Sequence, residues 1–350
     1  MSICAERVHG GPHGLSAEAR SLLERAGRVL DFSVNLNPYG PPRALLDALQ
    51  GAELARYPDP DAQAARASWA QTLDTSPARI AVGHGAADLL WALARALLAP
   101  GDRAALLEPT FSEFRVAAAA AGARVESIRV EQAAQFVPEL ARVIEAARGV
   151  RALYVCAPNN PTGVHLESAW LSQLARALPE VCVVVDQSFL ALSDHAHELD
   201  ARLPDNVVCV RSLTKDFALP GLRIGLLIGA PALVERIEAQ RPTWSTSAPA
   251  QAAIAAAARE QAFVRSSWEQ LRRDRAEVAR VLRSLGLTPL PSASAYQLVR
   301  VGDAAAFCRQ LWGQGVLVRD CSSFGLPEYV RIAARPEAEV AQWKAALAGG

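Results

Sequence analysis

Short apolar runs alternate with helical patterns through the middle of the chain. Runs rich in β-branched residues occupy 152–156, 181–185 and 207–211. Unbroken apolar strands of this length, separated by helices, are typical of a parallel sheet that is covered on both faces. The strands expected in this part are residues 79–82, 103–107, 124–130, 152–156, 181–185, 207–211 and 224–228, and the helices include 86–98, 112–122 and 167–178.

The pattern changes after residue 230. A long helical stretch is expected from 231 to 285, with an interruption at 242–249, where two prolines occur. Strand, helix, strand and strand then follow at 296–301, 304–314, 316–320 and 329–333. We therefore predict an α/β fold: a three-layer α/β/α large domain with a mostly parallel sheet, and a smaller α+β C-terminal domain. The predicted division is 1–45 for an N-terminal segment that packs on the small domain and the active site, 46–230 for the large domain and 231–350 for the small one.

Composition excludes several classes of partner. The 350 residues are 51% apolar and 21% charged, and 36 Lys and Arg balance 36 Asp and Glu, so no global charge favours nucleic acid or a membrane surface. The start of the sequence does not resemble a secretory signal, and the apolar runs are too short to span a bilayer. The six cysteines lack the spacing of a metal site, so no metal is expected and a reducing cytoplasm is predicted. They are Cys4, Cys156, Cys182, Cys209, Cys308 and Cys321.

The strongest local motif is S-L-T-K at residues 212–215, directly after the strand at 207–211. A lysine just beyond a strand end of an α/β sheet lies where ligands bind, and its amine can form an imine with an aldehyde cofactor. Ser212, Thr214 and Arg223 add two hydroxyls and a guanidinium, which suit a phosphate group. Alone, the motif favours a surface lysine beside a turn, because short motifs often match by chance.

Three further elements fit the same cofactor. Asp186 ends a buried strand, and its carboxylate needs a partner such as a protonated pyridine nitrogen, although it could simply cap the next turn. The string P-N-N-P-T-G at 158–163 follows another buried strand and offers the amide of Asn160, or forms only a turn. The string G-H-G-A-A-D at 83–88 joins a strand to a helix, whose first amides form an anion site. Together with Lys215, these elements indicate a pyridoxal 5′-phosphate (PLP) site.

The order of these motifs resembles the fold-type I, aspartate aminotransferase-like PLP enzymes over essentially the whole chain. Within that superfamily the chain is most similar to the histidinol-phosphate aminotransferase group, and inside it to the threonine-phosphate decarboxylases of cobalamin synthesis. The strings that support the narrower match are H-G-G at 9–11, D-F-S-V-N-L-N-P at 31–38, R-Y-P-D at 56–59, R-S-L-T-K at 211–215, P-T-W-S at 242–245 and V-R-D-C at 318–321.

The resemblance implies a role for each matching residue. Lys215 would hold PLP as a Schiff base and shuttle protons, Asp186 would pair with the pyridine nitrogen, and Asn160 would contact the phenolate oxygen. The other implied cofactor contacts are Phe111, which stacks on the ring, and the phosphate ligands Gly85, Ala86, Ala87, Ser212, Thr214, Arg223 and, from the other subunit of a homodimer, Tyr57. The implied substrate contacts are His9, Gly10 and Asn35 from the N-terminal segment, Arg331 for the α-carboxylate and Arg319 for a distal phosphate.

The reaction is left open between two chemistries. PLP enzymes break whichever Cα bond stands perpendicular to the imine plane, so orientation of the substrate decides between decarboxylation and transamination. Phe189 and the H-G-G start favour a decarboxylase of an O-phosphorylated amino acid such as threonine phosphate; the alternative is a histidinol-phosphate type aminotransferase. A binding or regulatory module is a third hypothesis, opposed by the complete cofactor motifs. Gln187 replaces the usual acidic residue, and Ala86 stands where a polar residue is common, which puts the substrate in doubt more than the cofactor.

Overall fold

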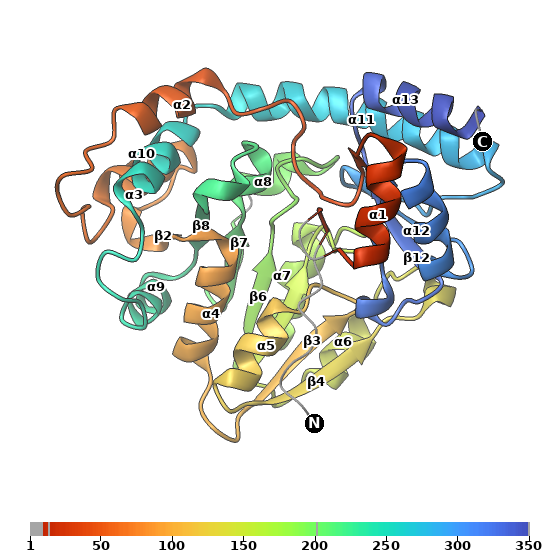
Figure 1. Ribbon diagram of the computed structural model, residues 1–350. Coiled ribbons are helices and arrows are strands. Elements are labelled where there is room, and N and C mark those ends of the chain that lie inside the picture. Colours follow the sequence, from red (N-terminus) through yellow and green to blue (C-terminus); the bar gives the residue numbers. More distant parts are fainter. Residues whose placement is uncertain (1–9, 13–14, 201, 349–350) are drawn as a thin grey trace.

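A seven-stranded sheet forms the centre of the larger part of the molecule. The computed structural model describes residues 10–12, 15–200 and 202–348. The strand order is β2-β8-β7-β6-β5-β3-β4; β8 runs antiparallel to both of its neighbours, and the other pairs are parallel. The mostly parallel α/β fold is confirmed (Figure 1). The strands are β2 (Ile80–Gly83), β3 (Arg103–Glu108), β4 (Arg124–Arg129), β5 (Ala152–Cys156), β6 (Cys182–Asp186), β7 (Val207–Arg211) and β8 (Gly225–Ile228).

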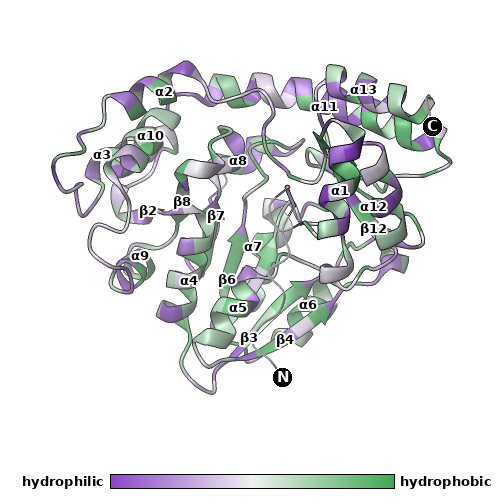
Figure 2. Cartoon of the chain, viewed as in Figure 1, coloured by the Kyte–Doolittle hydropathy of each residue, from purple (hydrophilic) through white to green (hydrophobic). Residues whose placement is uncertain are grey.

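Helices cover both faces of this sheet, because its inner strands alternate apolar side chains to either side. Val184 and Val208 point into a core with Leu89 and Phe114, whereas Val183 points into a second core on the opposite face. The first face is covered by α4 (Gly85–Leu97), α5 (Glu113–Ala120) and α9 (Pro231–Glu238), and the second by α6 (Leu140–Ala146) and α7 (Ser168–Ala177). Figure 2 shows the hydrophobic residues concentrated along the central strands. This two-sided burial explains why the strands read as unbroken apolar runs.

A third core lies where α2 (Arg43–Gln50), α3 (Gln63–Thr72) and α10 (Ala248–Ala257) pack together. The indole of Trp69 donates a hydrogen bond to the carbonyl of Ile254 at 2.8 Å. Ser247 caps α10, and the alanines that follow let the neighbouring helices approach closely. Both α9 and α10 follow residue 230 yet pack against the larger part, so the division at 230–231 stays a prediction.

The smaller part combines a three-stranded sheet with helices from both ends of the chain. β1 (Leu30–Asp31) pairs in parallel with β10 (Val316–Leu317), and α1 (Ala17–Ala26) packs on α12 (Ala304–Gly313). Phe32 and Trp343 are fully buried in its core, with ring centroids 5.0 Å apart. The remaining elements are β9 (Tyr296–Arg300), β11 (Arg319–Asp320), β12 (Tyr329–Ala333) and α13 (Glu337–Ala348).

One long helix, α11 (Gln261–Ser284), joins the two parts (Figure 1). Its first half packs Trp268 and Leu271 into the α3–α10 core, and its second half packs Val281 and Leu282 into the smaller part. The stretch expected as one interrupted helix is therefore three helices. The strand expected at 316–320 is split into β10 and β11, which pair with different partners. In the described part of the chain, no helix is long and apolar enough to cross a membrane.

Candidate active site

A cavity of about 490 Å³ opens at the carboxyl ends of the parallel strands. Loops that follow β3, β5, β6 and β7 supply one side, while residues 33–36 and strands β11 and β12 supply the other. Ligands of α/β proteins bind at this edge of the sheet. The predicted site residues that line the cavity are Gly10, Asn35, Phe111, Asn160, Lys215, Arg319 and Arg331, together with Phe189.

Lys215 lies in the short helix α8 (Leu213–Asp216), immediately after β7. Its Nζ is 4.9 Å from the centre of the Phe189 ring. Asn37 holds the backbone of this turn. Its backbone N donates to the carbonyl of Lys215 at 3.1 Å, and its side-chain Nδ2 donates to the carbonyl of Asp216 at 2.9 Å. Burial lowers the pKa of Lys215, against the opposing effect of Asp186 and Asp216. A larger fraction of the amine is therefore neutral, which is the form that attacks a carbonyl group or accepts a proton.

Asp186 ends β6, the strand next to β7, and only 2% of its surface is exposed. The hydroxyl of Tyr154 donates to Oδ2 at 2.9 Å, and the backbone N of Ser188 donates to Oδ1 at 2.9 Å. Burial, followed by the charge of Asp186, raises the pKa of Tyr154 well above its usual value, so Tyr154 remains a donor. These two bonds fix the carboxylate and leave lone pairs for a further cationic or N–H partner.

Arg331 connects the N-terminal segment to the Asn160 loop. One terminal nitrogen, Nη1, donates to Oδ1 of Asn160, and the other, Nη2, donates to the carbonyl of Ser33 at 2.6 Å. The side chain is almost fully buried, and within the described residues its Nε has no hydrogen-bond partner. Burial lowers the pKa of Arg331 to about 10, so the guanidinium is still charged at neutral pH. A buried cation with an unused donor suits an anionic ligand.

Arg319 lies directly opposite Arg331 in the β11–β12 register. Its Nη2 donates to the hydroxyl of Ser323 at 2.7 Å, and its guanidinium carbon is 5.4 Å from the centre of the Phe324 ring. Burial lowers the pKa of Arg319 as well. Two guanidinium groups therefore face one cavity from adjacent strands, a suitable arrangement for a ligand with two anionic groups.

The predicted phosphate ligands come together at the start of α4. Gly85 has a φ of +82°, and a Cβ placed on it would lie 2.7 Å from Nη2 of Arg223. The hydroxyls of Ser212 and Thr214 are 2.7 Å apart. Ala86 and Ala87 continue the first turn of α4, whose N–H groups have no partner within the helix. Backbone amides, hydroxyls and a guanidinium thus form a cradle that a side chain at position 85 would fill.

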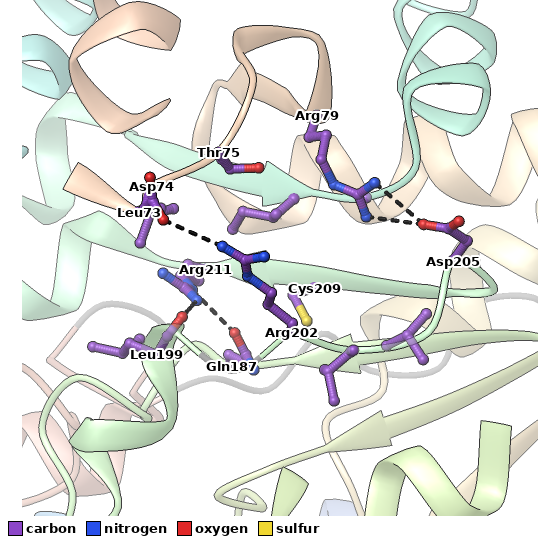
Figure 3. Close-up of a pocket in the computed structure, with 14 residues that line it drawn as sticks. Leu73, Asp74, Thr75, Arg79, Gln187, Leu199, Arg202, Asp205, Cys209 and Arg211 are labelled. Atoms are coloured by element: carbon purple, nitrogen blue, oxygen red, sulfur yellow. Dashed lines mark hydrogen bonds and ion pairs between the residues drawn. The ribbon is translucent and has the colours of Figure 1, made fainter. Parts of the chain in front are cut away.

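Gln187 points into a separate cavity of about 360 Å³, which shares no lining residue with the first. Its Oε1 accepts a hydrogen bond of 3.0 Å from Nε of Arg211, and Arg211 also donates to the carbonyl of Leu199. Figure 3 shows this pair in the same pocket as the ion pairs of Arg79 with Asp205 and of Arg202 with Asp74. Having Gln187 in place of the usual acidic residue therefore alters the contact with Arg211. The Gln187 side chain does not line the cavity that contains Lys215.

Asn35 gives an independent sign of a ligand. Both polar atoms of its amide are buried, and neither has a hydrogen-bond partner among the described residues. Unsatisfied buried amides are rare in folded proteins and call for a partner. With the cradle at Gly85 and the free Nε of Arg331, this shows that the donor set fits an anionic cofactor and an anionic substrate such as those predicted.

The predicted phosphate ligand Tyr57 does not line the cavity of its own chain. Tyr57 is 78% exposed and stacks on Trp244, with ring centroids 4.4 Å apart. His9 lies outside the described residues, whereas its neighbour Gly10 packs so closely on Ser33 that an added Cβ would lie 2.4 Å from the Ser33 carbonyl.

Sequence reasoning missed the supporting contacts of Tyr154, Asn37 and Ser33. Tyr154 precedes Asp186 by 32 residues, and Asn37 precedes Asp216 by 179 residues, so no local spacing reveals these pairs. The only signal was the position of Asn37 and Ser33 within the D-F-S-V-N-L-N-P string.

Comparison with known proteins identifies the family. The model of the family "Aminotransferase class I and II" matches residues 27–347. The chain belongs to this aminotransferase family. Histidinol-phosphate aminotransferase 2 of Ralstonia nicotianae is 33% identical over 339 residues, which cover 94% of this chain and 90% of that protein. Histidinol-phosphate aminotransferase of Methanopyrus kandleri is also 33% identical, over 87% of this chain and 83% of its own length.

A solved structure gives the same picture for this aminotransferase. The crystal structure of histidinol-phosphate aminotransferase from Sinorhizobium meliloti in complex with PLP superposes with a TM-score of 0.82 at 25% identity, covering 95% of this chain and 94% of that one. The resemblance to fold-type I enzymes of the histidinol-phosphate aminotransferase group is confirmed.

The predicted decarboxylase activity must be corrected. Relatives that match most of the chain are named histidinol-phosphate aminotransferases. The expectation of a threonine-phosphate decarboxylase in cobalamin synthesis is therefore replaced by that of an aminotransferase. Phe189, which suggested decarboxylation, packs edge-on against Tyr296, with ring centroids 5.0 Å apart. This apolar contact is compatible with either reaction and does not select between them.

Asp216 is expected to make the stability of this aminotransferase depend on pH. Burial raises its pKa from 3.8 to about 7. Between these values the folded protein keeps a proton that the unfolded chain has lost, so stability falls as pH rises from about 4 to 7. We expect Asp216→Asn to be more stable than the wild type above pH 7, by on the order of 4 kcal/mol, and the difference to vanish near pH 4. Urea unfolding of the cofactor-free protein across this range measures it.

Exposed Asp61→Asn is the control and is expected to leave the pH profile unchanged. A constant difference between Asp216→Asn and the wild type at all pH values would contradict the raised pKa.

Proposed function

We propose that this protein is an aminotransferase of the histidinol-phosphate type, which moves an amino group between a phosphorylated amine and an oxo acid. The observation that supports this most is the pair of buried arginines, Arg319 and Arg331, in the cavity that contains Lys215. Two fixed guanidinium groups suit a phosphate and a carboxylate. The names of the matching relatives agree with the phosphorylated amine, and the oxo acid would supply the carboxylate.

The predicted cofactor, PLP, is confirmed at the level of the family and of a solved relative that contains it. When bound, PLP acts as an electron sink that stabilises negative charge at the Cα atom of the substrate. Lys215 would hold it covalently, Asp186 would accept from its ring nitrogen, and Asn160 would donate to its ring oxygen. The remaining proposed contacts are Phe111 on the ring and Gly85, Ala86, Ala87, Ser212, Thr214 and Arg223 around the phosphate.

Lys215 is also the proposed proton carrier. Its lowered pKa favours the neutral amine, so Nζ can take a proton from the substrate Cα and hold it. The Phe189 ring beside Nζ excludes water from that side of the amine. Arg331 would hold the substrate carboxylate and thereby fix which Cα bond faces Lys215. In this proposal the arginine determines the orientation and the lysine moves the proton.

A substrate assay tests the proposed function. The PLP-loaded protein is incubated with histidinol phosphate and a panel of 2-oxo acids, and the phosphorylated carbonyl product, the new amino acid and released carbon dioxide are all measured. We expect stoichiometric amino transfer without carbon dioxide. Absence of amino transfer with every acceptor, or release of carbon dioxide from a phosphorylated amino acid instead, would refute the proposal.

We also propose that the working unit is a homodimer in which Tyr57 contacts the cofactor phosphate of the other subunit. Tyr57 and Trp244 form an exposed aromatic pair, and Tyr57 does not line the cavity of its own chain. Exposed aromatic side chains are enriched in interfaces.

Mixed dimers of Tyr57→Ala and Lys215→Ala chains distinguish a Tyr57 that acts on the site of the other subunit from one that acts on the site of its own chain. If Tyr57 acts across the interface, one site of each mixed dimer has both residues, so mixing two impaired variants should restore activity. Activity equal to the sum of the unmixed variants would contradict an intersubunit Tyr57.

A further inference from the structure

A group of metal-ligating side chains lies beside the active-site loops but outside the cavity. His165, His195 and Glu198 each offer a ligand atom, and these atoms lie within 4.8 Å of one another. Nε2 of His165 is 3.2 Å from Oε2 of Glu198, and Nδ1 of His195 is 3.9 Å from Oε1. The two imidazole rings stack, with centroids 4.2 Å apart.

The spacing of these atoms suits a tetrahedral metal ion. Ligands bound at 2.0–2.1 Å in a tetrahedral site lie about 3.4 Å apart. The separations from Glu198 to the histidines are 3.2 Å from Oε2 and 3.9 Å from Oε1, and the chosen ligand atoms lie within 4.8 Å of one another. Two histidines and one glutamate, with a fourth position open to water, are a known ligand set for Zn²⁺. The three side chains would have to draw together around the ion to reach tetrahedral geometry.

The surroundings hold the ligands ready for a cation. The backbone N and the hydroxyl of Ser168 donate to Oε2 of Glu198 at 2.8 and 2.7 Å, which fixes the carboxylate. The side chain of His165 is 4% exposed, that of Glu198 14% and that of His195 30%. Nδ1 of His165 is buried, and it has no hydrogen-bond partner among the residues that the structure describes.

The carboxylate of Glu198 and the two imidazoles lie together in a largely buried position. A cation there would compensate the carboxylate.

We propose that His165, His195 and Glu198 bind one divalent transition-metal ion, with Zn²⁺ as the representative. The spacing of the cysteines predicts no metal site, whereas His165 and His195 are 30 residues apart and meet only through the fold. His165 follows Asn160 by five residues and His195 follows Phe189 by six, so the ion would join the loop after β5 to the loop after β6. Nitrogen ligands select Zn²⁺ over Mg²⁺, which prefers oxygen.

Calorimetric titration of the tag-free, PLP-loaded, chelator-treated protein with Zn²⁺ tests the proposal. We expect one ion per chain, no binding of Mg²⁺, and a rise in melting temperature with Zn²⁺. Glu198→Gln and His195→Gln should each weaken Zn²⁺ binding at least about tenfold, since even indirect changes at metal sites cost that much. Glu167→Gln is the matched control: it removes an exposed charge that also acts on His165, and Zn²⁺ affinity should change less than twofold.

The cofactor absorbance band checks that each variant is folded. A measurement on the wild type alone avoids any folding defect: crystals grown with Zn²⁺ should show an anomalous peak among the three side chains. Either an unaltered affinity in both ligand variants or the absence of a peak and of stoichiometric binding in the wild type would overturn the proposal.

Discussion

Replacing Lys215 by Ala is expected to abolish amino transfer and to remove the absorbance band of the lysine-bound cofactor. The variant loses both the covalent link to PLP and the group that moves the proton at Cα. Loss of a positioned acid–base group alone lowers rates by roughly 10²–10⁴-fold, and loss of the covalent link adds to this. Absorbance spectra and single-turnover rates measure the two effects separately. The surrounding turn should persist, because Asn37 binds the backbone carbonyls at 215 and 216 and not the side chain.

The chain offers a natural control for this experiment, because it contains only two lysines, Lys215 and Lys344. Lys344 lies on α13 and pairs with Glu277 at the surface. Lys344→Ala should keep the absorbance band and the activity. Borohydride reduction followed by peptide mapping should place the cofactor on Lys215, and a label on Lys344 or a retained band in Lys215→Ala would contradict the central assignment.

Replacing Arg331 by Ala is expected to reduce kcat/KM for the amino-acid substrate by roughly 30- to 4000-fold. Removing one partner of a buried charge pair costs about 2–5 kcal/mol, and each 1.4 kcal/mol corresponds to a factor of ten. Arg331→Lys keeps the charge but loses the planar fork, so it should fall between this variant and the wild type. Steady-state kinetics with a carboxylate substrate and with its amine analogue lacking the carboxylate measure the effect, which should be confined to the former.

Arg300→Ala serves as the control, because Arg300 lies on the adjacent strand β9 but is exposed and pairs with Glu328. Its kinetic constants should match those of the wild type. Equal losses for both substrates in Arg331→Ala would show that the arginine supports the fold of the site without binding the carboxylate.

The strands of the large sheet could be predicted to within about two residues, because two-sided burial leaves unbroken apolar runs. The helices before β2 and the last helix, α13, could not. α1 is short and only moderately apolar, although Ser16 as its cap and Gly27 after its last turn are recognisable signals. α10 and α12 lie where the pattern predicts helix, whereas the order of the strands depends on contacts between distant segments.

The candidate site likewise contains residues that could be predicted from the sequence and contacts that could not. Residues directly after strand ends, such as Asp186, Asn160 and Lys215, could be predicted because parallel strands end at one edge of the sheet. Contacts between the two parts, such as Arg331 with Asn160, span 171 residues and become visible only in the structure. The reaction was mispredicted from Phe189 because one apolar side chain does not determine the orientation of a bound substrate.

The pairing of β11 with β12 has a thermodynamic consequence. It sets Arg319 and Arg331 directly opposite each other, and the charge of Arg319 contributes to the lowered pKa of Arg331. Like charges on facing strands destabilise a sheet by a few tenths to about 1 kcal/mol. A dianion that bridges the two guanidinium groups removes this repulsion, so ligand binding and folding are linked through the same pair. The protein is thus least stable when empty, and phosphate or sulfate in a buffer would act on it as a specific ligand rather than as an inert salt.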